Sequence, residues 1–174
     1  ASVPMLETYA DGSKGIRKPA TSEGGQTGTA EVRAYRLSKL LKVGNVPETE
    51  FTKDGKATRQ RFVHGKTVLE SGRTFKPDDQ DLSDIAIFDF IIGNTDRHDA
   101  NLMHDKAGRL IAVDHGMVGK PSFEKIATLY RNRYQLKTVN PSPTALKRLA
   151  QVREHQVDDQ AAWERINQVL ERYK

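Results

Sequence analysis

The spacing of apolar residues predicts short strands in the first third of the chain. Residues 5–10 and 15–18 flank Asp11-Gly12, a pair that favours tight turns, so an antiparallel hairpin is expected there. Residues 48–52 and 57–63 flank Asp54-Gly55 in the same way and predict a second hairpin. A small antiparallel sheet is the expected result.

A single helix is expected between the two hairpins, over residues 30–43. Apolar side chains recur at helical spacing from Ala30 to Leu41, and charged residues occupy the positions between them. Thr29 can cap the start of this helix, and Gly44 can end it.

Residues 64–80 are polar and rich in turn-forming residues, which predicts a connection between two lobes, residues 1–64 and 65–174. In the second lobe, residues 82–92 predict a buried helix capped by Asp81 or Ser83. Residues 102–103 and 110–113 predict a short hairpin, and two final helices are expected over residues 143–152 and 160–173. The pattern as a whole predicts an α+β fold, compact and two-lobed, with a mostly helical second lobe.

Candidate chemistry is concentrated between the buried helix and the end of the short hairpin. The segment GNTDRHDAN occupies residues 93–101, and DHG follows at residues 114–116. Asp96 could act as a general base toward a hydroxyl group, and His98 could carry a proton because imidazole titrates near neutral pH. Asn101 and Asp114 offer the hard oxygen ligands that Mg²⁺ prefers beside nucleotide phosphates. The arrangement indicates phosphoryl transfer.

Phosphoryl transfer also needs a cation for the phosphates, which the first lobe can supply. Lys18 ends the second expected strand, and Glu31 lies on the first turn of the expected helix. A strand lysine paired with a helix glutamate is the device that positions phosphates in kinases. Taken alone, the pair is weak evidence, because lysine and glutamate are abundant on protein surfaces.

Composition narrows the classes of function. The formal charge of +5 and the pI of about 9.4 are compatible with an anionic ligand, but aromatic residues are few and do not alternate with basic ones, so no nucleic acid partner is expected. The chain has no cysteine, which excludes thiolate catalysis and cysteine-bound zinc and suits a reducing compartment. No apolar run approaches the roughly 18 residues of a membrane span, and no signal peptide is evident at the first residues. A cytoplasmic location, in the cell of origin or in a host, is expected.

The same residues carry a resemblance that extends over about residues 1–118. Six segments occur in the order that a two-lobed kinase requires: Lys18-Pro19, EVRAYRL from Glu31, Val46-Pro47, RFV from Arg61, IGNTDRHDAN from Ile92 and IAVDHG from Ile111. The chain thereby resembles the phosphatidylinositol 3-/4-kinase-like branch of the protein kinase superfamily, which includes actin-fragmin kinase, HipA-like kinases and small bacterial effector kinases.

The resemblance implies an ATP- and magnesium-dependent phosphotransferase with a protein-kinase-like fold. Lys18 then matches the lysine that contacts phosphate, Glu31 matches its helix partner, Asp96 is the catalytic-loop acid, and Asn101 and Asp114 are the metal ligands. Adenine would lie against the linker formed by Phe62, Val63 and His64. The chain departs from the family pattern in having His115 in place of a common phenylalanine and in lacking a glycine-rich loop, so Ser2 and nearby amides would cover the phosphates.

Three functions are consistent with these residues. The first is a kinase acting on serine or threonine of a protein, preferred over a lipid kinase because no amphipathic membrane-binding segment or accessory domain is evident. The second is a pseudokinase that keeps the scaffold for nucleotide binding or interaction. The third is a kinase-fold enzyme that performs AMP transfer or glutamylation, since a fold fixes neither which phosphate is attacked nor the acceptor.

Overall fold

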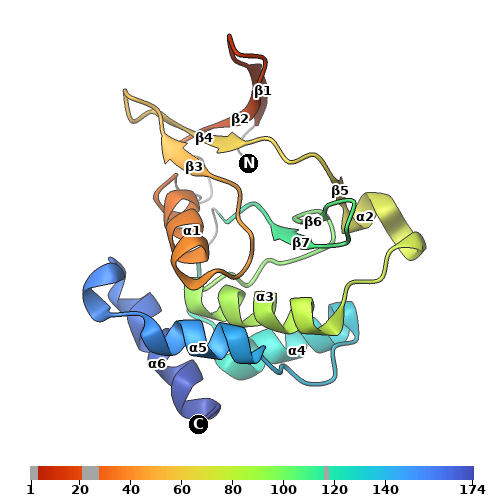
Figure 1. Ribbon diagram of the computed structural model, residues 1–174, viewed down its shortest axis with the longest axis vertical. Helices are drawn as coiled ribbons and strands as arrows, with labels where there is room; N and C mark the ends of the chain where they lie inside the picture. Colours follow the sequence, from red (N-terminus) through yellow and green to blue (C-terminus); the bar gives the residue numbers. More distant parts are fainter. Residues whose placement is uncertain (1–3, 21–27, 116–117) are drawn as a thin grey trace.

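The computed structural model describes residues 4–20, 28–115 and 118–174 of the 174-residue chain. Its first part is a sheet with one helix beneath it, and its second part is mainly helical (Figure 1). We call β1–β4 and α1 the N-terminal lobe and the elements after them the C-terminal lobe. The mixed α+β fold predicted from the sequence is confirmed.

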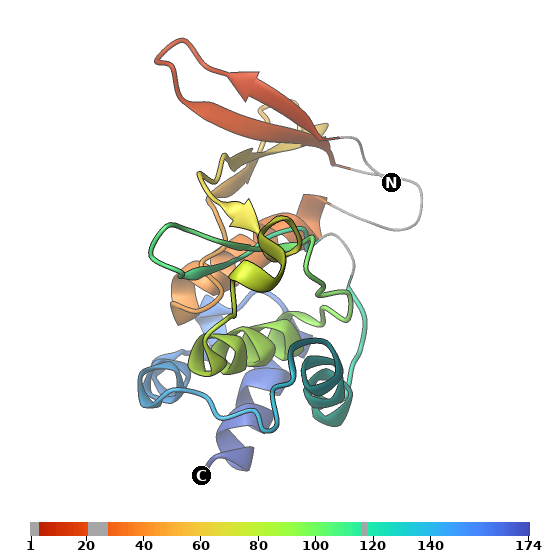
Figure 2. The same cartoon turned by 90° about the vertical axis from the view of Figure 1, so that its right-hand side faces the viewer.

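Two hairpins form the sheet of the N-terminal lobe. Strands β1 (Met5–Thr8) and β2 (Lys14–Pro19) pair antiparallel, as do β3 (Thr49–Phe51) and β4 (Ala57–Arg61). Strand β2 also pairs with β4, which gives the order β1-β2-β4-β3. Both predicted Asp-Gly turns are present, and Gly12 and Gly55 take positive φ values of 85° and 70°. The hairpin formed by β1 and β2 projects at the far end of the molecule (Figure 2).

Helix α1 (Gly28–Leu41) joins the sheet to the C-terminal lobe. Its apolar stripe, including Ala34, Leu37 and Leu41, is buried in the main core and packs against α3 and α5. The chain turns away at Gly44, whose φ is +81°, and a Cβ there would lie 2.7 Å from the Phe88 ring. The helix expected between the hairpins is confirmed, and a glycine is required where it meets α3. Thr29 was wrong as its cap, because the helix begins at Gly28 and includes Thr29.

Helix α3 (Asp79–Ile92) is the centre of the C-terminal lobe, with ten of its residues buried. The predicted caps, Asp81 and Ser83, were wrong. Asp78 caps the helix by accepting a hydrogen bond from the Asp81 backbone N–H, so the helix includes Asp81 and Ser83. The helix ends at Gly93, which adopts a left-handed conformation with φ of 77°.

A three-stranded sheet lies between α3 and the N-terminal lobe. Strands β6 (Leu102–His104) and β7 (Leu110–Ala112) form the predicted hairpin, and β5 (Lys66–Thr67) pairs with β6. The segment expected to be only a connection also contains the short helix α2 (Val68–Ser71) and a 3₁₀ turn η1 (Gly72–Thr74). Reciprocal hydrogen bonds between Thr67 and Glu70 cap the start of α2.

Three helices complete the C-terminal lobe: α4 (Phe123–Tyr134), α5 (Pro143–Gln151) and α6 (Gln160–Arg172), with a 3₁₀ turn η2 (Glu154–Gln156) before the last. Helices α5 and α6 were predicted, whereas α4 was not. Ile126, Tyr130 and Tyr134 are buried along one face of α4. In the part of the chain that the structure describes, no helix has the length and hydrophobicity needed to cross a bilayer.

Candidate active site

Three charged side chains from distant parts of the sequence meet between the lobes. The Nζ atom of Lys18, on β2, lies 3.7 Å from Oε1 of Glu31 on α1 and 3.6 Å from Oδ1 of Asp114, which follows β7. Glu31 is almost fully buried, while about half of the Asp114 side chain is exposed. One cation is thus held between a buried carboxylate and a solvent-facing one, where it could bind an anionic ligand.

Glu31 connects the N-terminal lobe to the segment that carries Asp114. Its Oε1 accepts a hydrogen bond of 2.9 Å from the backbone N–H of His115. Burial raises the pKa of Glu31, the charge of Lys18 opposes this, and nearby Asp114 adds to it. The pKa of Glu31 thus depends on the positions of Lys18 and Asp114. An anion that drew Lys18 away from Glu31 would raise that pKa further.

Asp96 and His98 lie together on the loop after α3. The Asp96 carboxylate is mostly exposed, its backbone N–H donates to Oδ1 of Asn94, and its Oδ2 lies 3.9 Å from Nε2 of His98. Nδ1 of His98 accepts a hydrogen bond from the Ala100 backbone N–H, so Nε2 carries the proton in the neutral ring. The loop therefore presents an accessible carboxylate on a fixed backbone, beside an imidazole N–H.

The side chain of Asn101 forms hydrogen bonds with two backbone groups of this loop. Its Nδ2 donates to the Asp96 carbonyl oxygen at 2.7 Å, and its Oδ1 accepts from the His98 backbone N–H at 2.8 Å. The Val113 backbone N–H donates to the Asn101 carbonyl oxygen, and Leu102 pairs with Ala112 in the hairpin. Asn101 and Asp114 are thereby placed at the same end of the β6–β7 hairpin.

A buried arginine holds the loop and the hairpin together. Arg97 is fully buried and donates from Nε and Nη2 to the two carboxylate oxygens of Asp89, on α3, at 3.0 and 2.8 Å. Its Nη1 donates to the carbonyl oxygens of Asn101 and Val113, and its Nη2 also donates to Nε2 of His115. All five N–H groups of the guanidinium are used, so Arg97 fixes the segments carrying Asn101 and Asp114 at once.

The surroundings of Asp89 complete this network. Asp89 accepts further hydrogen bonds from the Tyr130 hydroxyl and the Asn94 amide, and Arg133 donates to the Arg97 carbonyl oxygen. Burial disfavours the charged form of Arg97, but Asp89 outweighs this, and the pKa of Arg97 is raised. Helix α4 is therefore bonded to the loop through Tyr130 and Arg133.

His115 lies directly behind the site and is buried against Phe88. Burial, followed by the charges of Arg97 and Lys18, lowers the pKa of His115 well below its usual value. Because arginine only donates, Nε2 of His115 must accept from Arg97, which places the proton on Nδ1. Within the described residues, Nδ1 has no hydrogen-bond partner.

The remaining predicted site residues are Phe62, Val63, His64 and Ser2. Phe62, Val63 and His64 follow β4, and the Phe62 and His64 rings meet edge to face with centroids 5.0 Å apart. Among residues 4–20, 28–115 and 118–174, no hydrogen bond, ion pair or ring contact joins these three to Lys18, Glu31 or Asp114. Ser2, expected to cover the phosphates, lies outside the described residues, as does Gly116.

The donors that Mg²⁺ would need are compatible with this arrangement. Asp114 has a half-exposed carboxylate. Oδ1 of Asn101 accepts from the His98 backbone N–H at 2.8 Å and, more weakly, from Nη1 of Arg97 at 3.5 Å, and the longer bond would be exchanged for the ion. Two protein oxygens are sufficient when phosphates and waters complete the shell, as is usual for this ion. The described residues contain no cluster of three or more His, Cys, Asp and Glu side chains that could hold a metal on its own.

Comparison with known proteins decides the family. The family model described as "Phosphatidylinositol 3- and 4-kinase" matches residues 31–148, about two thirds of the chain. The chain belongs to the phosphatidylinositol 3- and 4-kinase family. The match begins at Glu31 and includes Asp96, Asn101 and Asp114, whereas Lys18 precedes it.

A solved structure of another kinase is similar to this chain at low sequence identity. A crystal structure of the Rio2 kinase in complex with ADP/Mg²⁺-phosphoaspartate, from Chaetomium thermophilum, is 16% identical with a TM-score of 0.46; the alignment covers 98% of this chain and 66% of the Rio2 chain. No curated protein gives a significant match.

Sequence reasoning missed three residues that support the site of this kinase-family chain. Asp89 and Tyr130 belong to the buried network, and Arg165 of α6 donates to the carbonyl oxygens of Ile91 and Gly119. Arg165 thus links the end of α3 to the segment after Asp114. An acid inside the apolar run from Ile85 to Ile92 was the one available signal for Asp89, since a buried charge requires a partner.

Proposed function

We propose that this chain is an ATP- and magnesium-dependent kinase that transfers the γ-phosphate to a hydroxyl group, most readily a serine or threonine of a protein. The observation that carries the proposal is the contact of Lys18 with both Glu31 and Asp114, which brings the N-terminal lobe to the end of the hairpin that carries Asn101 and Asp114. Membership of the phosphatidylinositol 3- and 4-kinase family supports phosphotransfer as the class of reaction.

In this proposal Lys18 binds phosphate oxygens, and Glu31 keeps the lysine extended toward them. Asp114 would exchange its direct contact with Lys18 for a shared contact with the bound triphosphate. The positive φ of Asp114, 61°, supports a special role, because a residue other than glycine rarely adopts this conformation without a constraint.

Asp96 would orient the acceptor hydroxyl and accept its proton, and the Nε2–H of His98, whose nitrogen lies 3.9 Å from Oδ2 of Asp96, would help to orient that carboxylate. Asn101 and Asp114 would hold magnesium. When bound, the ion would neutralise charge on the phosphates and keep them in line for transfer.

A protein acceptor is preferred to a lipid because of the distribution of apolar surface. The exposed large apolar side chains of the described residues are dispersed over β1, β3, α2 and the segment before α4: Met5, Leu6, Phe51, Leu69 and Val118. Membrane-surface binding requires a continuous apolar face flanked by basic residues, and the dispersed positions do not supply one.

A second candidate is a nucleotide-binding scaffold without transfer. It is favoured by the engagement of both amide atoms of Asn101 within the loop and by the direct pairing of Lys18 with Asp114. ATP labelled separately at the α and γ positions, incubated with the chain and a serine- and threonine-containing peptide library, separates the candidates. The proposal requires γ label on peptide. Transfer of α label would mean AMP transfer, and nucleotide binding without transfer of either label would leave the scaffold.

A further inference from the structure

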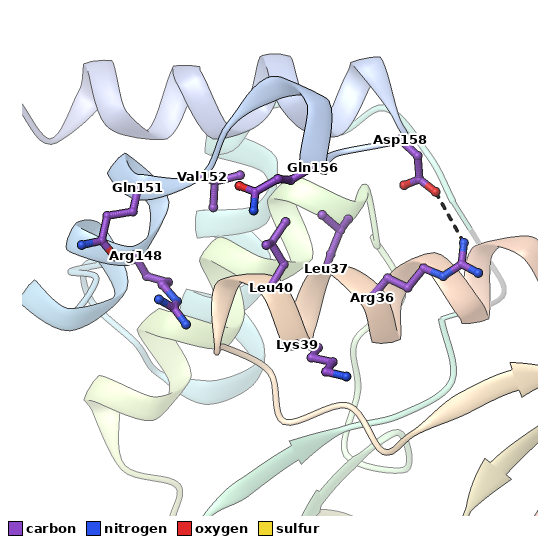
Figure 3. A pocket seen from close by; sticks show the side chains of 9 residues that line it. All are labelled: Arg36, Leu37, Lys39, Leu40, Arg148, Gln151, Val152, Gln156 and Asp158. Atoms are coloured by element: carbon purple, nitrogen blue, oxygen red, sulfur yellow. Dashed lines mark ion pairs between the residues drawn. The ribbon is translucent and has the colours of Figure 1, made fainter.

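A second recess lies on the opposite side of α1 from Glu31 and is unrelated to the site described above. It is a cavity of about 600 Å³ between α1, the end of α5 and the η2 segment, lined by Arg36, Leu37, Lys39, Leu40, Arg148, Gln151, Val152, Gln156 and Asp158. Figure 3 shows Leu37 and Leu40 pointing from α1 toward the wall that carries Val152 and Gln156. The floor is therefore apolar and contributed by both lobes.

Cations dominate the rim of this cavity. Arg36, Lys39 and Arg148 face a single acid, Asp158, which pairs with Arg36 at 3.5 Å through two well-exposed side chains. Among the described residues, Lys39 and Arg148 have no ion-pair partner, and Nε of Arg148 is buried without a hydrogen-bond acceptor. A buried guanidinium N–H without an acceptor favours a ligand that brings a carboxylate.

A neighbouring cavity of about 370 Å³ adjoins the recess and shares Arg148 and Gln151 with it. The second cavity adds Lys42 and Lys147, and its acid, Asp84, already accepts hydrogen bonds from the backbone N–H and hydroxyl of Ser142. The two cavities together follow α1 and α5 as an elongated basic furrow with an apolar floor.

We propose that this furrow is a docking site for an acidic, leucine-containing segment of another protein. An extended segment fits two adjoining cavities better than a compact ligand does, its carboxylates would pair with Lys39 and Arg148, and an apolar side chain would contact Leu37 and Leu40. Gln151 and Gln156 supply amide donors and acceptors of the kind that a peptide main chain requires. Peptide binding in the furrow would not depend on phosphate transfer, because none of the candidate active-site residues lines it.

A library of random octapeptides displayed on phage, selected on the full chain, tests the proposal. We expect enrichment of sequences that combine Asp or Glu with Leu, Ile or Phe. A synthetic peptide of the enriched sequence, followed by fluorescence anisotropy, should bind about tenfold more weakly to Lys39→Glu and to Arg148→Gln, and more weakly at high salt.

Lys125→Glu on α4 is the matched control, because this lysine is also exposed and does not line the furrow. It should bind the peptide like the unaltered chain. Absence of acidic sequences from the selected pool would overturn the proposal, and so would equal binding to Lys39→Glu and the control. Binding of laurate in the furrow without binding of any selected peptide would also overturn it, since the ligand would then be a small amphipathic acid.

Discussion

Arg97 and Asp89 form a two-point ion pair at 2.8 and 3.0 Å in which neither side chain is exposed. The pair links the central helix to the loop that carries Asp96, and the remaining donors of Arg97 reach the hairpin that ends at Asp114. The candidate site is therefore set on a rigid buried support, although its own carboxylates face solvent.

Replacing Arg97 with Lys should destabilise the fold by about 3–5 kcal/mol, because a lysine has three donors for a site that uses five and leaves Asp89 under-paired. Urea denaturation measures the loss. The exposed pair Arg172–Glu124, also at 2.8 Å, is the matched control, and Glu124→Gln should cost less than about 1 kcal/mol. Similar losses for the two variants would show that burial is not what makes the Arg97 pair strong.

Gly93→Ala should destabilise the fold more than Gly55→Ala. Both glycines have positive φ, 77° and 70°, so each substitution carries a similar backbone strain of about 1–2 kcal/mol. A Cβ at Gly93 would in addition lie 2.5 Å from the Gly119 carbonyl oxygen, whereas nothing lies within 4 Å at Gly55. Thermal unfolding of both variants tests this difference, and equal losses would contradict the close approach of Gly119.

In magnesium-free buffer, the free energy of unfolding should fall as the pH decreases below 6.5, because the folded chain keeps His115 neutral. Its folded pKa is lowered by burial, so the unfolded chain binds a proton there first, and acid favours unfolding. The slope from this residue can reach about 1.4 kcal/mol per pH unit. Denaturant titrations of the unaltered chain and of His115→Phe measure it: the variant is expected to be less stable at neutral pH but to lack this slope. An unchanged slope would mean that His115 is protonated when folded.

Asp96→Asn should reduce phosphate transfer by at least about a hundredfold and leave nucleotide affinity nearly unchanged. The carboxylate is mostly exposed and accepts no hydrogen bond from another described residue, so the substitution should also preserve stability. Single-turnover transfer and nucleotide titration, measured together, test both expectations. Normal turnover would remove Asp96 from the mechanism.

Lys18→Met should weaken nucleotide binding and reduce transfer by about a hundredfold, the usual effect of losing one preorganised charge contact. Glu31→Gln should have a smaller effect on binding, because the amide oxygen can still accept from the His115 backbone N–H. A Lys18→Met variant with unaltered affinity for nucleotide would separate this lysine from the phosphates.

The sequence pattern was sufficient for elements whose apolar and polar residues are clearly separated, such as α1 and α6. Helix α4 was missed because Glu124, Lys125 and Arg131 dominate its composition, although Ile126 and Tyr130 have the spacing of a buried face. Asp78 was missed as a cap because several acids occur together before α3, and only the backbone shows which one receives the Asp81 N–H.

The meeting of Lys18, Glu31 and Asp114 could be predicted from the sequence because their order follows a kinase pattern, while their roles stay a prediction. Their support was not accessible. Asp89 lies in the second half of α3, which is apolar on every side, so no periodicity indicates which of its faces meets the loop. Its partner Tyr130 lies on the helix that was missed. Partnerships between distant residues of this kind depend on tertiary packing, which a local pattern does not encode.

The contacts of Arg165 have a consequence for how the chain can be shortened. This α6 residue binds the carbonyl oxygens of Ile91 and Gly119, on either side of the loop that carries Asp96. It lies beyond residue 148, where the match to the family ends. Lys18 lies before the other limit of that match. A fragment trimmed to residues 31–148 would thus keep Asp96 and Asp114. It would lose Lys18, which contacts Asp114, and Arg165, which holds the backbone on both sides of the loop.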